Sequence, residues 1–589
     1  MDSASDNSET LLMQEKSRQL DSRGPVDRRW WREWEVAALG LLVVAVYFPR
    51  LTALPICGEE SRWASAAREM IASGDWVVPR QQGTIFPERP PLTSWAMGLV
   101  GLARHEVDLT AIRLPSIVAI LILTWLIYAY ARVWMSRLGS FASAAAFVSM
   151  GQVLQLGRTG ESEAVFTLFT AASLLVWHWG YMRAWPMALV WSLGYTLAAL
   201  AALTKGPQAP VYFVSTCGAY LLLRRDWRWL LARGHLTGLA CFALTVSAWL
   251  VPFAIASGWR AVDDIWTGLA EERFRFHGLL RHLATYPFET FGCLLPWSPI
   301  LCLLIKPSVR KWLLANRPQF QFLVAALVVT YPTVWFATGA MGRYYMPLYP
   351  CLAVLIGLVI ESCTHGDAGA FDRNSWRLYL RAVGGVILAA GFVVVAISYV
   401  PLTQFDDARQ PLAFQAVWIV AAVLAASVLI WASFGEHAPR PQIAVLTVAA
   451  FAGLAYAGAI VNSRVHGSND LTPAIVHLKE QLGDPGQIVS LDRVYHRFAY
   501  EYGTPIRQIA WPTTAAELPS QFDYFCFDER PGDPALKQAL GRLPFEWDVV
   551  ARFGCDPVRR DVPQRSVVVG RVRRAGIAAQ PSVSRPALR

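Results

Sequence analysis

The sequence predicts a mostly α-helical, polytopic membrane protein that ends in a small α/β domain. The chain has 589 residues, of which 54% are hydrophobic and only 16% charged. Nearly uncharged runs of membrane-spanning length recur between Val36 and Val461, and soluble globular domains do not carry such runs. After Val461 the long runs stop, and short β-branched or aromatic segments replace them. Such segments are typical of strands.

The long apolar runs predict about thirteen transmembrane helices. A further segment, 90–103, is apolar but shorter than a typical span, so we expect it to lie along the bilayer surface. The predicted spans are 36–56, 114–131, 139–156, 164–182, 186–204, 207–223, 236–256, 291–305, 320–338, 345–362, 380–401, 414–434 and 441–461.

The basic residues between the spans predict the orientation. The segments 224–235 and 306–319 carry four Lys or Arg each, and the positive-inside rule places such short loops in the cytoplasm. The polar segment 1–35 is then cytoplasmic as well, and because a long span follows it, it does not resemble a cleavable signal peptide. The predicted transmembrane domain is 36–461, with exoplasmic loops 57–113 and 257–290.

The tail 462–573 is predicted to be an exoplasmic α/β domain. The runs IVSLD, YFCFDE, VVARFG and SVVVGRV read as strands, and helix-like segments such as 472–482 separate them. Cys526 and Cys555 both fall in this tail and could form a disulfide there, which the sequence leaves open. The last stretch, 574–589, is rich in Pro, Ser and Arg and is expected to be disordered.

The net charge of +10 does not indicate a nucleic-acid-binding protein. Most Lys and Arg residues stand between apolar runs, where they act as topology signals. The sequence contains no Gly-rich phosphate loop, no aromatic RNA-binding motif and no zinc-ligand spacing. We therefore expect membrane lipids and no nucleic acid among its partners.

Ionisable residues gather at the predicted exoplasmic side. Lys205 interrupts two long apolar stretches, where an ionisable group costs roughly 2.5–3.5 kcal/mol and is by default a candidate for function. Cations there suit a lipid-linked anionic substrate, and carboxylates would supply base or metal chemistry. The other members of this set are Glu59, Glu60, Glu88, Arg89, Glu161, Glu163, Glu271, Glu272, Arg273, Arg275, His277, His282 and Arg343.

Several of these residues also have a purely structural reading. Arg275 or Arg343 can pair with a neighbouring carboxylate or a lipid headgroup, and Glu60 with Arg62 reads as a charge pair at a helix start. Glu161 and Glu163 stand two positions apart and would point in different directions on a helix. We expect one of these two acids to cap the helix or face solvent and the other to face a cavity.

Seven ordered segments resemble one family of membrane enzymes. In this order they resemble the polyprenyl-phosphate-sugar glycosyltransferases of the protein O-mannosyltransferase and aminoarabinose (lipid A) transferase type. The resemblance covers roughly 36–360 and implies the C-type glycosyltransferase fold, a multi-pass protein of the bacterial inner membrane and a monomer. The segments are GEESRWASAAREMIASGDWVVPR, FPERPPLTSW, AIRLPS, GRTGESEAVFTLF, LTKGP, EERFRFHG with YPFETFGCLLPWSP, and GRYYMPLYP.

The resemblance implies a role for most of the ionisable residues. It implies catalytic carboxylates at Glu59 and Glu163, and a candidate metal ligand at Glu88, so that a divalent metal ion is the one cofactor to consider. It implies substrate contacts at Glu60 and Tyr345. Contacts with the donor phosphate are implied for Arg89, Lys205, Arg275 and Arg343.

The chain departs from the family pattern at a few positions. Both catalytic positions, 59 and 163, carry Glu where Asp is usual, which moves each carboxylate outward by one methylene. Arg89 replaces a Lys and retains the charge. Glu272 stands where aminoarabinose transferases have a His, and this puts metal binding of the aminoarabinose type in doubt.

These features predict transfer of a glycosyl group from a polyprenyl-phosphate-linked sugar to a lipid, glycan or protein acceptor at the exoplasmic face. Glu59 would orient or deprotonate the acceptor with Glu163 in support, and the cations would stabilise the leaving phosphate. Three alternatives stay open: a transporter or lipid flippase, a catalytically inactive relative, and a structural or sensor protein that carries the exoplasmic tail. Transporters place polar residues near the bilayer midplane, often within internal repeats, and the sequence shows no such repeat.

Overall fold

A computed structural model describes most of the chain, which divides into two compact units. Unit 1 comprises Met1–Leu51, Pro87–Ala96 and Arg113–Ser463, and unit 2 comprises Thr52–Phe86, Met97–Ile112 and Arg464–Arg589. The described residues are 30–86, 89–263, 265, 278–307, 309–310, 313, 317–364, 370–399, 412–435, 439–483, 488–514, 517, 522–530, 532–555 and 565–573.

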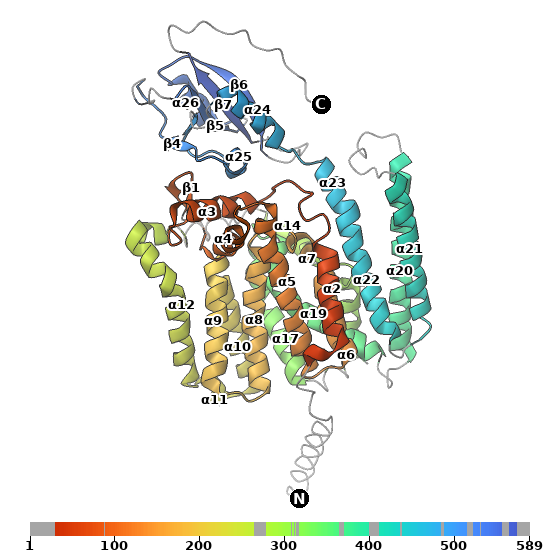
Figure 1. The fold of residues 1–589 in the computed structure, drawn as a ribbon. Helices are drawn as coiled ribbons and strands as arrows, with labels where there is room; N and C mark the ends of the chain where they lie inside the picture. The colour runs from red at the N-terminus through yellow and green to blue at the C-terminus, as the bar shows by residue number, and fades with distance from the viewer. Residues whose placement is uncertain are drawn as a thin grey trace, which may run out of the picture. The chain divides into compact units, whose positions relative to one another are not determined.

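Unit 1 is a bundle of helices (Figure 1). Its long helices are apolar over most of their length, and a helix satisfies its own backbone hydrogen bonds, as a membrane interior requires. The helices are η1 (Trp30–Arg32), α2 (Trp34–Tyr47), α5 (Leu109–Arg132), α6 (Arg137–Ser149), α7 (Gly151–Leu156), α8 (Glu163–Met182), α9 (Met187–Lys205), α10 (Gln208–Arg224), α11 (Trp227–Leu230), α12 (Gly234–Ser257), α14 (Leu279–Cys293), α15 (Ser298–Leu301), η2 (Cys302–Ile305), α17 (Arg317–Thr330), α18 (Pro332–Trp335), η3 (Gly342–Leu348), α19 (Tyr349–Thr364), α20 (Ala370–Tyr399), α21 (Leu412–Ala432), α22 (Arg440–Ala455), η5 (Tyr456–Ile460) and α23 (Val461–His466).

Among the described residues, eight helices are long and apolar enough to cross a membrane. A ninth span results if the helices Leu279–Cys293 and Ser298–Ile305, which meet at a bend of 113°, are counted as one. The eight are Leu109–Arg132, Glu163–Met182, Met187–Lys205, Trp227–Ser257, Gly342–Thr364, Asp372–Tyr399, Phe414–Ala432 and Arg440–Val465. The mostly α-helical membrane fold is therefore confirmed, whereas the count of thirteen spans is not.

The difference in span count has local causes. The first predicted span forms α2, which has only 14 residues, and the span predicted at 207–223 forms α10, which has 17. The span predicted at 139–156 breaks at Met150, whose backbone is extended between α6 and α7. The span predicted at 320–338 breaks before Pro332, which starts α18, because proline interrupts the helical hydrogen bonds.

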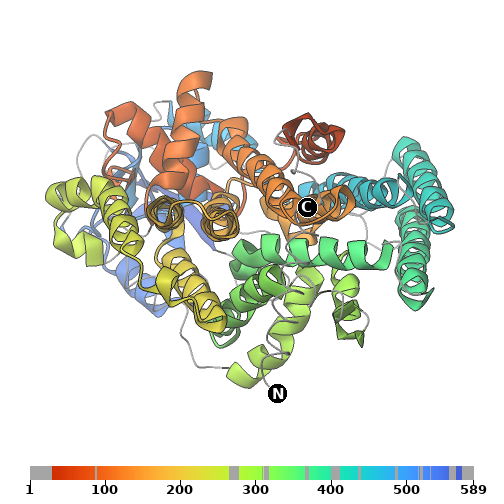
Figure 2. The same ribbon diagram turned by 90° about the horizontal axis from the view of Figure 1, so that it is seen from below.

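The spans of unit 1 differ in how deeply they are buried. In the most apolar 18-residue stretch of Gly342–Thr364, 94% of the residues are buried. In the corresponding stretches of Trp227–Ser257 and Asp372–Tyr399, only 17% and 22% of the residues are buried. Figure 2 views the long helices nearly end-on. The helix that follows η3 is thus in the core of the bundle, and α12 and α20 lie at its periphery.

Unit 2 contains a five-stranded mixed sheet in the order β4-β3-β5-β7-β6. Strand β3 pairs in parallel with β4 and β5, whereas β7 pairs antiparallel with β5 and β6. The four strand runs found in the sequence form β3, β5, β6 and β7, and the short β4 was not predicted. The elements of the tail are α24 (Thr472–Leu482), β3 (Ile488–Leu491), α25 (His496–Tyr502), β4 (Arg507–Ile509), β5 (Tyr524–Glu529), α26 (Pro534–Gly541), β6 (Trp547–Gly554) and β7 (Ser566–Val572).

The sheet buries a different set of side chains on each face. Cys526, Val567 and Val569 pack into one hydrophobic cluster with α24 and α25. Phe525 and Val568, their neighbours in sequence, pack into the other cluster with α26. This alternation with a period of two is the property of a strand that is covered on both faces.

Most of the first loop of the chain, Thr52–Phe86 and Met97–Ile112, belongs to unit 2, and this part packs against α25. Ser61 Oγ is 2.6 Å from His496 Nδ1, and Arg68 Nη1 donates to the backbone oxygen of Tyr500 at 2.7 Å. Trp63 and Tyr500 share a hydrophobic cluster. The loop elements are α3 (Glu60–Ser73), β1 (Arg80–Gln81), β2 (Thr84–Ile85) and α4 (Leu92–Arg104), the last of which forms from the apolar segment 90–103.

The two cysteines of the tail are free thiols in the structure. Both Cys526 and Cys555 are buried in the same hydrophobic cluster of unit 2, where they pack as small apolar residues. The tail 574–589, predicted to be disordered, lies outside the described residues.

Candidate active site

Four charged side chains of unit 1 form one cluster. Lys205 Nζ is 2.6 Å from Glu163 Oε1, and Arg343 Nη1 is 2.7 Å from Glu161 Oε2. Arg343 also reaches Glu163, with its Nε 3.6 Å from Oε1. The cluster thus joins the start of α8, the end of α9 and η3, and we call these four residues the ion cluster.

Local sequence explains how Lys205 and Glu163 come to these positions. Lys205 is the last residue of α9, and Gly206 follows with φ = +105°, a left-handed conformation that favours glycine. Glu163 is the first residue of α8. A cation at a helix C-terminus and an anion at a helix N-terminus are each stabilised by the helix dipole, so the pair joins two complementary helix ends.

Hydrogen bonds from neighbouring helices hold η3 in place. Gln208 Nε2 donates to the Tyr344 backbone oxygen at 3.3 Å, and Tyr349 Oη donates to the Gly342 oxygen at 3.1 Å. The Gly342 N–H donates to Glu289 Oε1 at 2.6 Å. The ring of Tyr344 lies 4.9 Å from Lys205 Nζ, within the range of a cation–π contact. Arg343 is therefore presented from a short element that is anchored on both sides.

The ion cluster is balanced and largely buried. Two carboxylates face two cations, and the side chains of Lys205 and Glu163 are only 9% and 5% exposed. Removal of one partner from a buried pair leaves an uncompensated charge, which costs about 3–5 kcal/mol. Arg343 is 24% exposed and is the most open member. It is the cation of the cluster best able to contact a further anion.

The sequence suggested that Glu161 and Glu163 face in different directions, but the structure brings both to Arg343. Both are buried, and both approach Arg343. We expected one of them to cap the helix or face solvent, and the solvent-facing alternative is wrong because both are buried. Glu161 precedes α8 in a non-helical turn. The angular spacing of helix positions does not apply to such a turn.

The second acidic pair begins α3 in unit 2. Glu59 is the N-terminal cap residue of α3, its side chain is 38% exposed, and its Oε2 is 2.9 Å from Arg62 Nε. Glu60 is fully buried, and its Oε2 accepts a hydrogen bond from the Cys57 N–H at 3.0 Å. Glu60 therefore supports the helix start from inside, whereas Glu59 remains accessible.

The predicted site residues divide between the two units and the undescribed segments. Arg89 belongs to unit 1 and lies partly buried in a bend before α4. Glu88 and Arg275 lie outside the described residues, as do Glu271, Glu272, Arg273 and His277. The structure brings Glu163, Lys205 and Arg343 together. A common site that also contains Glu59, Glu60 and Arg275 stays a prediction.

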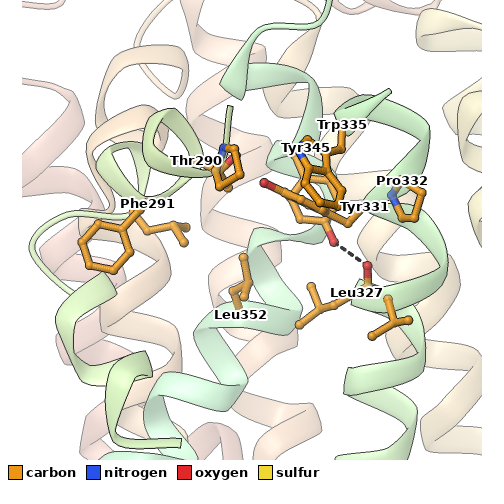
Figure 3. A pocket seen from close by; sticks show the side chains of 11 residues that line it. Thr290, Phe291, Leu327, Tyr331, Pro332, Trp335, Tyr345 and Leu352 are labelled. Atoms are coloured by element: carbon orange, nitrogen blue, oxygen red, sulfur yellow. Dashed lines mark hydrogen bonds between the residues drawn. The ribbon is translucent and has the colours of Figure 1, made fainter. Parts of the chain in front are cut away.

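Tyr345 lies beside the ion cluster in sequence but lines an apolar cavity. The cavity has a volume of about 510 Å³ between α14, α17, α18, η3 and α19, and Figure 3 shows Tyr345 and Tyr331 on its wall. The Tyr345 hydroxyl donates to the Leu327 backbone oxygen at 3.1 Å, which satisfies its polar end. The remaining lining is mostly aliphatic or aromatic, including Phe291, Trp335 and Leu352, and suits a hydrocarbon ligand.

The described carboxylates do not form a set of ligands suited to a divalent metal ion. No three His, Cys, Asp or Glu residues of the described part of the chain come together as a metal site. Glu163 and Glu161 pair with Lys205 and Arg343, which neutralise both carboxylates. A metal role for Glu88 stays a prediction, because that residue lies outside the described part.

Three residues that hold the site were not predicted from the sequence. Gln208 and Glu289 anchor η3, and Tyr344 contacts both cations of the cluster. Tyr344 stands between Arg343 and Tyr345 in the GRYYMPLYP segment, so that segment contained a signal. The sequence indicated a role for Gln208 only through its position three residues after Lys205. It indicated a role for Glu289 only through its place in the segment YPFETFG.

Comparison with known proteins gives one consistent similarity. The family described as dolichyl-phosphate-mannose-protein mannosyltransferase matches residues 88–251. An undecaprenyl phosphate-alpha-4-amino-4-deoxy-L-arabinose arabinosyl transferase of Pseudomonas aeruginosa (strain LESB58) is 28% identical over 396 residues, which are 63% of this chain and 67% of the relative. A second such transferase, from Proteus mirabilis, is 25% identical over 403 residues, 65% of this chain and 69% of the relative.

The fold matches a solved structure over nearly its whole length. The crystal structure of ArnT from Cupriavidus metallidurans bound to undecaprenyl phosphate superposes with a TM-score of 0.66 at 17% identity, covering 91% of this chain and 98% of that chain. The C-type glycosyltransferase fold with a C-terminal α/β domain is therefore confirmed, as is the resemblance found in the motifs. The chain is a multi-pass membrane protein with this fold.

Proposed function

We propose that this chain is a membrane glycosyltransferase that moves a sugar from a polyprenyl-phosphate donor to a lipid acceptor. The observation that carries the proposal is the buried ion cluster, which presents Arg343 from the segment GRYYMPLYP. The names of the similar transferases specify an undecaprenyl phosphate-linked aminopentose. We propose the same donor class here, and lipid A as the acceptor that the motif resemblance implies.

The cations of the site stabilise the leaving phosphate. The bond from the anomeric carbon to the phosphate oxygen breaks, and the polyprenyl phosphate departs with the electron pair, so it needs positive charge more than it needs an acid. Arg343 and Arg89 are both partly exposed, and a guanidinium binds a phosphate through two parallel hydrogen bonds. Arg275 completes this set by motif resemblance.

Lys205 acts through Glu163. Its ammonium is 2.6 Å from the Glu163 carboxylate, which leaves it less available to a ligand than Arg343. The pair fixes the carboxylate that also approaches Arg343. Lys205 and Glu163 therefore position the arginine that contacts the phosphate.

Glu59 takes the proton of the acceptor. An acceptor oxygen forms the new bond to the anomeric carbon and gives up its proton to a nearby base. Glu59 stands at a helix start, its side chain is 38% exposed, and among the described residues it forms an ion pair with the partly exposed Arg62, so a substrate can reach it. Glu163 is fixed between two cations and cannot move toward a substrate in the same way.

The apolar cavity beside Tyr345 receives part of the polyprenyl chain. Its volume of about 510 Å³ falls within the range of ligand cavities, and its wall reaches η3, the same element that carries Arg343. The same short element, η3, therefore carries the arginine that binds the phosphate and a residue that lines the cavity for the hydrocarbon chain.

The orientation follows from the basic loops. We propose that the N-terminus is cytoplasmic and that the ion cluster and the tail domain face the periplasm, in a monomeric protein of the bacterial inner membrane. The cluster supports this arrangement because Lys205 ends α9 and Glu163 begins α8, so its charges meet at helix ends. A transporter would place such charges near the middle of the bilayer.

The test is transfer from a radiolabelled undecaprenyl-phosphate aminopentose to lipid A by the purified full chain in detergent. Wild type should transfer the sugar, and Arg343→Gln should lower kcat/KM about 10²-fold, the size of the loss expected for one preorganised charge contact. Arg440→Gln, at the first residue of α22, is the matched arginine control and should behave as wild type. The proposal fails if wild type transfers no label, or if Arg343→Gln and Arg440→Gln behave alike.

A further inference from the structure

Three arginines gather around the end of α2 in unit 1, apart from the ion cluster. Arg158 Nη2 donates to the backbone oxygen of Val46, and Arg113 Nη1 donates to that of Leu51 at 2.6 Å. Arg50 Nη1 donates to the Ala457 oxygen at 3.2 Å. These contacts cap backbone carbonyls, as cations near a helix C-terminus often do.

The capping contacts leave the charges of Arg50 and Arg158 unbalanced. In the described part of the chain, neither Arg50 nor Arg158 forms an ion pair with a carboxylate. Arg158 is only 6% exposed, and its Nε and Nη1 find no hydrogen-bond partner among the described residues. Burial of unsatisfied donors on a charged group costs free energy, so an anion from outside the chain would satisfy them.

The electrostatics around Arg158 agree with this geometry. Burial lowers the pKa of the Arg158 guanidinium, and the nearby charges of Arg113 and Arg50 lower it further, although Tyr47 and Tyr456 act in the opposite direction. The ring of Tyr456 lies 5.5 Å from the guanidinium carbon, which is weak compensation for a full charge.

An apolar groove begins where the arginines gather. It has a volume of about 540 Å³ and lies between α2, α21 and α22. Val46 and Ala457 line the groove, and their backbone oxygens accept the hydrogen bonds from Arg158 and Arg50. Leu424 lines it further along and is 61% exposed on the outer surface of the unit. Two residues that line the groove therefore accept hydrogen bonds from the arginines, and the groove faces outward.

A π-helical segment forms one side of the junction. Helix α22 passes at Tyr456 into η5, a π-helix that ends at Ile460, and Arg50 reaches the carbonyl oxygens of Ala457 and Gly458 within it. Such segments inside α-helices are frequent at functional sites. Here it offers carbonyl oxygens to Arg50 beside the groove.

We infer that this arrangement is a binding site for an anionic phospholipid, with its phosphate at Arg50 and Arg158 and one acyl chain in the groove. The apolar lining in the membrane-spanning unit matches a hydrocarbon chain, and the unpaired guanidinium donors match phosphate oxygens. Free phosphate alone would leave the groove without a role, and a neutral lipid would leave the arginines without an anion.

The site lies at the same end of unit 1 as the ion cluster. Arg158 and Glu161 both stand in the short connection between α7 and α8. The lipid therefore comes from the same leaflet as the glycosyl donor, and its binding does not depend on transfer taking place.

Native mass spectrometry of the full chain in detergent tests the inference. Wild type is titrated with phosphatidylglycerol and, separately, with diacylglycerol of the same chains. The variants are Arg50→Gln, Arg158→Gln and Ala450→Phe, which adds a ring to an exposed groove residue. Arg440→Gln is the control, because Arg440 begins the same α22 but its guanidinium stacks on Trp431 at 4.9 Å.

Wild type and Arg440→Gln should bind phosphatidylglycerol alike, and Arg50→Gln and Ala450→Phe should each bind it about tenfold more weakly, as expected for one lost charge-assisted contact or a blocked chain. Diacylglycerol should bind weakly to every variant. Equal binding of the two lipids, or wild-type binding by both Arg50→Gln and Ala450→Phe, overturns the inference. Displacement of the lipid by an equal concentration of inorganic phosphate would indicate an ion site and would also overturn it. If Arg158→Gln does not fold, Arg50→Gln and Ala450→Phe decide the outcome.

Discussion

Two glutamates at helix starts, Glu163 in unit 1 and Glu59 in unit 2, have opposite surroundings. In unit 1, Glu161 and Glu163 are buried and pair with Arg343 and Lys205, residues brought from other elements. In unit 2, Glu59 is 38% exposed, and its ion partner among the described residues is Arg62, three positions further along the chain. Glu163 is fixed by tertiary structure, whereas the ion pair of Glu59 lies within the start of its own helix.

The difference suits the two groups to different tasks in the proposed reaction. A phosphate site gains from charges that are already oriented, because little reorganisation is then needed during the reaction. A general base must instead reach a substrate proton within hydrogen-bond distance, which an exposed side chain can do. We therefore assign positioning of charge to the ion cluster and proton transfer to Glu59.

Loss of Lys205 should have the largest effect. Lys205→Met leaves Arg343 as the remaining ion partner of the buried Glu163 among the described residues, so Arg343 is drawn away from the substrate phosphate. We expect kcat/KM to fall about 10³-fold, at the upper end for loss of one electrostatic contribution. The measurement is transfer from the labelled donor, with protein yield and gel-filtration profile recorded beside it.

A second variant separates the role of Lys205 in function from its role in folding. Glu163→Gln combined with Lys205→Met removes both charges of the pair, and a buried pair can often be replaced at little cost in stability. If the double variant folds as wild type but remains inactive, the pair is needed for function. Recovery of full activity in the double variant would contradict the assignment.

Neutralisation of Glu59 should have the next largest effect, but with little loss of stability. Glu59→Gln removes the proposed base and retains the shape of the side chain, so we expect kcat to fall about 10²-fold and the melting temperature to stay near that of wild type. A pH profile of kcat should lose its acidic limb in this variant. Unchanged kcat would show that the base lies elsewhere.

Glu163→Asp tests whether the longer side chain is adapted to this site. Aspartate restores the residue usual in the resembled family but withdraws the carboxylate by one methylene from Lys205, now 2.6 Å away. Misplacement of about 1 Å can cost up to 10²-fold, and we expect at least a tenfold fall in kcat/KM. An increase in activity would mean that glutamate here reflects a weakened enzyme.

Unit 2 should lose stability below pH 6.5. The pKa of His496 is well below its ordinary value of 6.5, because of burial and then the charges of Arg62, Arg565, Arg493 and Arg497. Below pH 6.5 His496 is protonated in the unfolded chain but stays neutral in the folded chain. Each further unit of decrease in pH therefore lowers the free energy of unfolding by up to about 1.4 kcal/mol.

The measurement for His496 is the melting temperature of the full chain in detergent from pH 7 to pH 5. The acids Glu69, Glu501 and Asp528 have raised pKa values and act in the opposite direction. The comparison is therefore between wild type and His496→Gln, whose difference should grow as the pH falls. Parallel curves would show that His496 does not contribute.

The smallest effect is expected at Arg62. Its pair with Glu59 is half exposed and local, and such surface pairs contribute about 0–1 kcal/mol. Arg62→Gln should therefore change the unfolding free energy by less than about 1 kcal/mol and leave Glu59 able to act as base, so kcat should stay within about threefold. A loss as large as that of Glu59→Gln would show that the pair acts as a unit.

Local patterns predicted the parts of this molecule that depend on local physics. The helix predicted at 472–482 has the bounds of α24, four of the five strands were present in the sequence pattern, and the LTKGP run marked the end of α9. These elements follow from side-chain periodicity and from glycine and proline positions.

The sequence could not show the contacts that join distant segments. Lys205 and Glu163 are 42 positions apart, and Arg343 and Glu161 are 182 apart, so the anion that Lys205 faces could not be identified from the chain order. The packing of the first loop into unit 2 is of the same kind, since Arg68 and Tyr500 lie 432 positions apart. Breaks in apolar runs, such as that at Met150, also escape a hydropathy pattern, which counts composition rather than backbone conformation.

The most direct test of the central claim is single-turnover transfer by the purified protein. Wild type, Lys205→Met and Arg440→Gln would each be mixed in excess over radiolabelled undecaprenyl-phosphate aminopentose in the presence of lipid A, and the labelled lipid product would be followed with time. We predict product from wild type and Arg440→Gln at similar rates and a rate about 10³-fold lower from Lys205→Met. No labelled product from wild type, or equal rates from all three proteins, would contradict the account.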